Sequence, residues 1–303
     1  MALVNTKKML KDALEKGYAI PAFNICNMES AQAVAEVCAE KNAPVIISVS
    51  EGAGKYAGFD YIRAIVEVAS KKSSNDIALH LDHGKTFDVC KAAIDAGFTS
   101  VMIDASALPY EENIAETKKV VDYAHARNVT VEAELGKIMG TEDLIHSDTE
   151  SFTDPEEAKD FVTRTGVDSL AISIGTAHGV NKSIKTPIIQ YGVIENVHAA
   201  IPEIPLVAHG SSTVPAKWVD LIKKYGGEIK KSQGISEEDI VKMSKTAICK
   251  INMDTDLRLA HTAGVREDLA LNPNHFDQRD YNKAGKKYVK EQIAHAVELV
   301  EGI

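Results

Sequence analysis

The feature of this sequence that most constrains its fold is an eightfold alternation between a short run rich in β-branched residues and a longer segment with helical spacing. The short runs have the length and composition of buried strands, and apolar residues recur every three or four positions between them. The eight predicted strands are residues 18–24, 44–49, 77–82, 100–104, 129–135, 169–174, 204–209 and 247–253. This alternation predicts parallel strands joined by crossover helices.

The alternation continues through all 303 residues without a low-complexity tract or a Ser/Gly-rich linker, which favours a single (β/α)8 TIM barrel over residues 1–303. The alternative is a doubly wound open sheet, but neither GxGxxG nor GxxxxGK[ST] follows any predicted strand. Three further features are expected. They are a mobile active-site loop at about 137–152, an insertion at about 226–236 and an extra C-terminal helix at about 280–302.

Composition excludes several classes of protein. The formal net charge of −10 argues against binding to nucleic acid or to an anionic membrane, since both need clustered Lys and Arg. No stretch approaches 18 apolar residues, and the amino-terminal segment is amphipathic rather than signal-like, so we expect a cytoplasmic protein. The four cysteines, Cys26, Cys38, Cys90 and Cys249, form no CxxC pair and are predicted to be reduced, buried thiols.

Three histidines are the leading candidates for chemistry. His83, His178 and His209 each stand at the end of a different predicted strand, and each is followed by glycine. A barrel builds its active site at these strand ends, and three converging neutral imidazoles leave an open coordination position, as in a catalytic Zn²⁺ site. Taken singly, each could instead be a hydrogen-bonded rim residue. His80, inside the third strand, is predicted to be packed and hydrogen-bonded rather than a ligand.

Carboxylates accompany these histidines. Asp82 precedes His83 and is either a partner of a metal ligand or a general acid/base beside the metal, and we favour the second role. Asp104 and Glu134 stand at the ends of the next two strands. They are predicted either to hold or orient a cation or to bind a neighbouring strand end.

Two segments are suited to bind phosphate. HGSST at 209–213 and NMDTD at 252–256 follow the last two strands, where barrels commonly bind phosphate through backbone N–H groups and hydroxyls. Lys182 and Arg258 are candidate partners for a second anionic group, with solvated surface charge as the alternative for each.

These segments together resemble the class II, metal-dependent fructose-bisphosphate aldolases and the similar tagatose-bisphosphate aldolases. The matching strings span nearly the whole chain in order. They are AFN (22–24), SEGAGKYAG (50–58), HLDHG (80–84), GFTSVMIDAS (97–106), VEAELG (131–136), GTAHG (175–179), HGSS (209–212) and KINMDTDLR (250–258).

The resemblance implies a (β/α)8 fold and a lyase of glycolysis and gluconeogenesis. Such an enzyme reversibly cleaves fructose 1,6-bisphosphate to dihydroxyacetone phosphate and glyceraldehyde 3-phosphate through an enediolate that Zn²⁺ stabilises. Carried over by position, His83, His178 and His209 become the zinc ligands. Asp82 exchanges the proton of the C4 hydroxyl, and Glu142, in the GTED segment, exchanges the C3 proton.

The resemblance also implies substrate contacts and further ions. The predicted substrate-binding residues are Asn24, Ser50, Gly179, Lys182, Gly210, Ser211, Asn252, Asp254, Thr255 and Arg258. A second divalent ion is expected at Asp104 and Glu134, and Na⁺ or K⁺ near the phosphate. A homodimer or homotetramer is expected.

Three alternatives stay open. GTAHG and AICKIN resemble the tagatose enzymes, whereas SEGAGKYAG and DTDLR resemble the fructose enzymes, which we favour. A barrel-type zinc hydrolase usually carries an HxH pair at its first strand, where this chain has AFN. A non-catalytic binding protein predicts loss of a ligand or of the loop acid, and this chain keeps them all.

Overall fold

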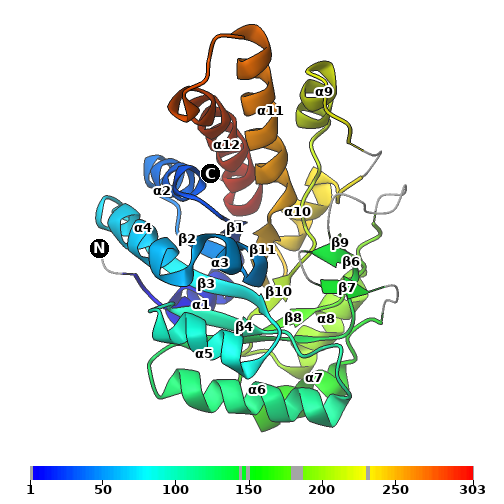
Figure 1. Ribbon diagram of the computed structural model, residues 1–303. Coiled ribbons are helices and arrows are strands. Elements are labelled where there is room, and N and C mark those ends of the chain that lie inside the picture. Colours follow the sequence, from blue (N-terminus) through cyan, green and yellow to red (C-terminus); the bar gives the residue numbers. More distant parts are fainter. Residues whose placement is uncertain (1–2, 143–144, 148–150, 179–186, 230–232, 303) are drawn as a thin grey trace.

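Eight parallel strands close into a barrel in this computed structural model, which describes residues 3–142, 145–147, 151–178, 187–229 and 233–302 (Figure 1). The order around the barrel is β1-β11-β10-β8-β5-β4-β3-β2. These strands are β1 (Ile20–Asn24), β2 (Val45–Ser50), β3 (Ile77–Gly84), β4 (Ser100–Ile103), β5 (Thr130–Leu135), β8 (Ser169–Ile172), β10 (Leu206–Ala208) and β11 (Ile248–Met253). Each predicted run overlaps one of them, although β2 and β3 extend past the predicted ends at 49 and 82. The closed ring confirms the barrel and excludes the open sheet.

Helices surround the barrel on its outer side (Figure 1). They are α1 (Thr6–Lys16), α2 (Met28–Glu40), α3 (Glu51–Ala57), α4 (Phe59–Lys71), α5 (Phe87–Asp95), α6 (Tyr110–His125), α7 (Pro155–Thr165), α8 (Tyr191–Ala200), α9 (Ala216–Lys224), α10 (Glu237–Met243), α11 (Thr255–Leu271) and α12 (Gln278–Glu301). The long α12 confirms the extra C-terminal helix. In the described part of the chain, no helix combines the length and the apolar character that crossing a membrane requires.

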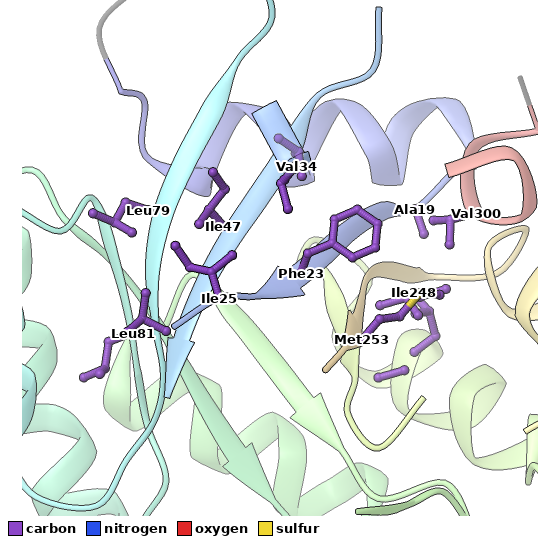
Figure 2. Packing of buried hydrophobic residues seen from close by; sticks show 14 of the residues in the cluster. Ala19, Phe23, Ile25, Val34, Ile47, Leu79, Leu81, Ile248, Met253 and Val300 are labelled. Atoms are coloured by element: carbon purple, nitrogen blue, oxygen red, sulfur yellow. The ribbon is translucent and has the colours of Figure 1, made fainter. Parts of the chain in front are cut away.

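The alternation of side chains along each strand separates the hydrophobic core from the barrel interior. In β3, Leu79 and Leu81 belong to the large apolar cluster between strands and helices, which also contains Phe23 of β1 and Val34 of α2 (Figure 2). The residues that alternate with them along the strand face the barrel axis, because side chains of a strand point alternately to its two faces. His80 is one of these inward residues.

One end of the barrel is sealed by apolar residues. Met9, Leu10 and Ala13 of α1 pack in one cluster with Ile20 and Ile46, which lie near the starts of β1 and β2. This packing closes the amino-terminal end of the barrel. The polar side chains are therefore left for the opposite end, where the strands finish.

The segment predicted as a loop at about 137–152 contains two short strands. β6 (Met139–Glu142) and β7 (Ile145–Ser147) pair in antiparallel fashion, and β9 (Ala177–His178) pairs with β6 in parallel fashion. β9 lies far from β6 along the chain, so this parallel pairing could not be predicted from the local sequence. Of the predicted insertion, residues 226–229 and 233–236 are described, and they lead into α10.

The four cysteines are free thiols, as predicted. Cys38, Cys90 and Cys249 are buried, whereas Cys26 is exposed, so the prediction of burial was wrong for Cys26. It lies in the connection between β1 and α2 and is followed by the polar Asn27.

Candidate active site

Two histidines from different strands meet at the carboxyl end of the barrel. His83 is the penultimate residue of β3, and His209 directly follows β10. Nε2 of His83 lies 3.0 Å from Nδ1 of His209, and both side chains are buried. His83 has a φ of 49°, a left-handed conformation that is uncommon outside glycine and often marks a functional site. The structure thus brings together two of the three predicted ligands.

The outer nitrogen of each ring is bound to a carboxylate. Nδ1 of His83 donates to Oδ2 of Asp104 at 3.0 Å, and Nε2 of His209 donates to Oε1 of Glu132 at 2.7 Å. Burial lowers the pKa of His83, but the carboxylates of Asp82 and Asp104 outweigh it and raise that pKa well above its usual value. Without a metal, Nε2 of His83 therefore carries a proton that it donates to the lone pair on Nδ1 of His209, and a metal ion held by both nitrogens would take the place of that proton. Since histidines that bind metal commonly show this carboxylate pairing, the residues present fit a divalent metal ion.

Asp82 lies beside the two histidines and is fully buried. Its Oδ2 accepts a hydrogen bond from the amide of Asn24 at 2.7 Å, and its Oδ1 accepts one from Asn252 at 3.0 Å. Burial is the largest influence and favours the neutral acid, but the nearby His83 and His209 outweigh it and lower the pKa of Asp82. Asp82 is therefore an ionised carboxylate that can accept a proton.

Glu134 is a second acidic residue close to Nδ1 of His83. Oε2 of Glu134 lies 3.9 Å from this nitrogen, and the hydroxyl of Ser106 donates to Asp104 at 2.7 Å and to Glu134 at 3.4 Å. Burial raises the pKa of Glu134 well above its usual value, and the nearby charge of Asp104 adds to this effect. Asp104, Glu134 and His83 lie close enough together to share a cation. The residues thus fit a cation, and the hydrogen bond from His83 to Asp104 also fits the alternative prediction, a bond to a neighbouring strand end.

Below this rim, four buried polar side chains form one hydrogen-bonded network inside the barrel, and we call Ser100, His80, Lys250 and Glu132 the deep layer. Nζ of Lys250 donates to Oε2 of Glu132 at 2.7 Å and to Nε2 of His80 at 3.2 Å. Nδ1 of His80 lies 2.8 Å from the hydroxyl of Ser100. Burial, together with the charge of Lys250, lowers the pKa of His80 to about 3. His80 is thus a neutral, packed residue, as predicted.

His178 lies on β9, and a backbone contact sets the position of β9 beside His209. Gly210 has a φ of +63°, and a Cβ on it would lie 2.7 Å from the backbone oxygen of Ala177. His209 precedes Gly210 and His178 follows Ala177, so the two backbones lie side by side. Glu142 ends β6, the strand that pairs with β9. The backbone therefore brings His178 and Glu142 to the same end of the barrel.

The two predicted phosphate-binding segments are tied to each other. Asp256 is fully buried and accepts hydrogen bonds from the backbone N–H and the hydroxyl of Thr213, at 2.9 and 3.0 Å, and from the N–H of Val214 at 2.8 Å. The hydroxyl of Ser212 accepts a hydrogen bond from the backbone of Asp254 at 3.3 Å. These contacts join the loops after β10 and β11 into one wall. The predicted substrate residues on this wall are Gly210, Ser211, Asn252, Asp254 and Thr255.

A cavity of about 410 Å³ opens beside the wall. Asn24, Ser50, Asp254 and Arg258 line it, and Asn24 connects it to Asp82 by the hydrogen bond described above. Arg258 is half-exposed and forms two contacts with the carboxylate of Asp254, at 2.7 and 2.6 Å. Four of the predicted substrate residues therefore share one cavity. Gly179 and Lys182 lie outside the described residues.

Three residues of this region received no role from the sequence, namely Glu132, Lys250 and Asp256. A signal existed for Lys250, because it is the single charge in the apolar run AICKINM and lies two positions before Asn252, on the same face of the strand. No local signal identifies its partner, because Glu132 lies 118 residues away in the chain.

The chain has many known relatives. The family described as fructose-bisphosphate aldolase class-II matches residues 4–302. The fructose-bisphosphate aldolase of Treponema pallidum is 43% identical, with 100% of this chain and 97% of that protein covered. The fructose-bisphosphate aldolase of Thermus caldophilus is 45% identical, with 98% of this chain and 97% of that protein covered.

Solved structures agree with these sequence matches. The YdjI aldolase from Escherichia coli K12 superposes with a TM-score of 0.80 at 32% identity, covering 98% of this chain and 97% of that one. A putative fructose-1,6-biphosphate aldolase from Coccidioides immitis superposes with a TM-score of 0.83 at 25% identity, covering 97% and 94%. The similarity therefore includes the barrel and its surrounding helices.

Proposed function

The chain belongs to the class II fructose-bisphosphate aldolase family, and from this premise we propose that it reversibly cleaves fructose 1,6-bisphosphate to dihydroxyacetone phosphate and glyceraldehyde 3-phosphate. It is accordingly an aldehyde-lyase whose substrate is a phosphorylated sugar. The observation that carries the proposal is the pair of facing nitrogens of His83 and His209, 3.0 Å apart, with both outer nitrogens on carboxylates.

The proposed metal is a catalytic Zn²⁺ held by His83, His178 and His209. His83 contributes Nε2 and His209 contributes Nδ1, since their other nitrogens donate to Asp104 and Glu132. A divalent ion held there acts as a Lewis acid toward the ketose carbonyl. The proposal keeps a second divalent ion at Asp104 and Glu134, and Na⁺ or K⁺ near the phosphate.

Asp82 is the proposed base for the C4 hydroxyl. Its lowered pKa keeps it ionised, and the amides of Asn24 and Asn252 fix the orientation of both its oxygens. In the cleavage direction, Asp82 takes the C4 hydroxyl proton as the C4 carbonyl forms and the C3–C4 bond breaks. The bonding electron pair stays with C3, which must then receive a proton.

Glu142 is the proposed donor of that proton. It stands at the end of β6, beside the strand that carries His178. Returning its proton to C3 completes dihydroxyacetone phosphate, and the reverse transfer starts aldol condensation. An acid on a segment outside the barrel can approach the face of the substrate that Asp82, within the barrel, does not reach.

The two phosphates are proposed to bind at the wall formed by the loops after β10 and β11 and in the cavity beside it. Gly210, Ser211 and Thr255 offer backbone N–H groups and hydroxyls for one phosphate. Ser50 and Arg258, which line the cavity, would bind the other. A role in glycolysis and gluconeogenesis, a cytoplasmic location and a homodimer or homotetramer complete the proposal and remain predictions.

The experiment that tests the function measures triose-phosphate release from fructose 1,6-bisphosphate and tagatose 1,6-bisphosphate in parallel. Each assay is run on the untreated protein, after a chelator, and after Zn²⁺ is added back. We expect chelator-sensitive cleavage that zinc restores and that is faster on the fructose substrate. Faster cleavage of the tagatose substrate would reassign the substrate. Cleavage that survives complete metal removal would refute the metal-dependent reaction.

A further inference from the structure

The deep layer contains a lysine in a place where a charge is costly. Lys250 is fully buried in the barrel interior. A buried charge is retained only where it is paired and hydrogen-bonded. Its partners, Glu132 at 2.7 Å and His80 at 3.2 Å, are themselves buried. These two partners hold the ammonium group of Lys250 in place, and through them it can act on the rim.

Hydrogen-bond direction in the deep layer follows from the lysine. An ammonium group only donates, so Nε2 of His80 accepts from Lys250 and Nδ1 of His80 carries the hydrogen. That hydrogen points to the hydroxyl of Ser100, 2.8 Å away. On its other side, Lys250 occupies Oε2 of Glu132. Lys250 thus sets the direction of the hydrogen bonds in two branches, one through His80 to Ser100 and one through Glu132.

The branch through Glu132 ends at a predicted metal ligand. With Oε2 occupied by Lys250, Oε1 of Glu132 faces Nε2 of His209 at 2.7 Å and accepts its hydrogen. The hydrogen is therefore on Nε2, and Nδ1 of His209 presents its lone pair toward His83. Without Lys250, the carboxylate of Glu132 could turn about its last side-chain bond. Glu132 would then no longer fix the orientation of the His209 imidazole.

We propose that Lys250 is a positioning residue of the metal centre, which acts through Glu132 to fix the ring nitrogen that His209 presents to the metal ion. This inference rests on the proposed metal site. It assigns no contact between Lys250 and the substrate or the metal. The branch through His80 and Ser100 points away from the centre, and changes there should leave the metal site intact.

The first test compares Lys250→Met with Ser100→Ala. Lys250→Met keeps an unbranched side chain of similar length, and Ser100→Ala removes the end of the other branch. Zn²⁺ dissociation constants are measured by chelator competition. We expect Lys250→Met to weaken Zn²⁺ binding about 10- to 100-fold, as for loss of other groups that orient metal ligands, and Ser100→Ala to stay within about twofold of the parent protein.

A second readout does not require a loaded enzyme. In metal-free protein labelled with ¹⁵N-histidine, two-bond ¹H–¹⁵N spectra report which ring nitrogen carries hydrogen, and His209→Gln identifies the His209 signals. The parent should show His209 protonated on Nε2, and Lys250→Met should lose this single form. A folded Lys250→Met protein with the parent tautomer and the parent Zn²⁺ affinity would overturn the proposal.

If Lys250→Met does not fold, a double variant tests whether Lys250 acts through Glu132. Glu132→Gln combined with Lys250→Met removes both charges of the pair and avoids an unpaired buried carboxylate. If Lys250 acts through Glu132, the double variant should bind Zn²⁺ as tightly as Glu132→Gln alone. Binding at least tenfold weaker than in Glu132→Gln would mean that Lys250 acts independently, contrary to the proposal.

Failure of this inference and failure of the proposed function give different results. A parent protein that takes up no stoichiometric Zn²⁺ contradicts the metal site itself. A parent protein that binds Zn²⁺ normally, with a Lys250→Met variant that does the same, contradicts only the role of Lys250.

Discussion

The deep layer and the rim of the barrel differ in how completely their polar atoms are paired. In the deep layer, the side-chain nitrogen and oxygen atoms of Ser100, His80, Lys250 and Glu132 all have hydrogen-bond partners. At the rim, several buried side-chain oxygens have none within the described part of the chain. They include Oδ1 of Asn24, Oδ1 of Asn252 and Oε2 of Glu134.

This difference separates scaffold from binding surface. A buried acceptor without a donor costs about 1–3 kcal/mol, so unpaired acceptors are expected where a ligand supplies the missing donor. Asn24 and Asn252 each use their N–H group on Asp82 and keep an oxygen that suits a sugar hydroxyl. The four side chains of the deep layer leave no polar atom without a hydrogen-bond partner. We therefore expect changes at the rim to alter binding and turnover directly, and changes in the deep layer to act through the stability of the fold and, for Lys250 and Glu132, through the orientation of His209.

The largest effect is expected from His209→Ala at the rim. Removing a ligand should weaken Zn²⁺ binding by more than the roughly 10- to 100-fold typical of residues that only orient a ligand, and cleavage should fall below detection. Metal content after gel filtration and triose-phosphate release measure the two effects. His125→Ala, on the exposed surface of α6, is the matched control and should retain both. Retention of stoichiometric zinc by His209→Ala would remove His209 from the ligand set.

Asp82→Asn should abolish the base while keeping the size of the side chain. Loss of a general acid/base group slows reactions by roughly 10²- to 10⁴-fold, so we expect kcat to fall within this range while zinc remains bound. Steady-state kinetics and metal analysis on the same preparation test this. Asp122→Asn, on exposed α6, controls for the substitution. A kcat within tenfold of the parent would assign the C4 proton to another group.

Sequence patterns identified the barrel because its determinants are local. Alternating runs such as 77–82 combine strand length with a two-residue period, and eight of them in order leave few alternative topologies. His83 and His209 could be found for the same reason, since each ends a strand and such residues share one face of a barrel. That their ring nitrogens face each other depends on the tertiary structure and cannot be read from the sequence.

What the sequence did not predict depends on distant partners. Lys250 is buried because Glu132, far away in the chain, neutralises it, and a lysine in a short strand otherwise indicates an exposed edge. The strand β6 pairs with β9, which lies far away in the chain, as well as with its neighbour β7. Cys26 is exposed in the connection between β1 and α2, whereas the other three cysteines lie in helices or strands that pack on the core.

Asn252→Ala tests the unpaired rim oxygens with a smaller effect. The variant loses the proposed contact to a substrate hydroxyl and one donor to Asp82, each a hydrogen bond to a buried group. The loss of both contacts costs about 1–3 kcal/mol in total, so kcat/KM should fall roughly 10- to 100-fold. The Zn²⁺ affinity should be unchanged. Asn282→Ala on α12 is the control. If kcat/KM stayed at the parent value, the free oxygen of Asn252 would not mark a substrate contact.

The smallest effect concerns His80 in the deep layer and appears as a dependence of stability on pH. The folded pKa of His80 is about 3, whereas an unfolded histidine titrates near about 6.5. Below about pH 6.5 the unfolded chain therefore binds a proton that folded His80 does not, so the stability due to neutral His80 is complete above that pH and is lost as the pH falls toward 3.

Between pH 7.5 and 5.5, this linkage removes about 1.4 kcal/mol from the free energy of unfolding of the parent protein, and His80→Gln should be spared that loss. Urea unfolding at both pH values measures it, in the presence of a chelator so that release of metal does not contribute. His80→Asn should behave like His80→Gln if loss of the imidazole is the cause. Equal losses in parent and variants would mean that His80 is protonated in the fold. Its Nε2 could then not accept from Lys250, and the deep layer would not be the closed network that distinguishes it from the rim.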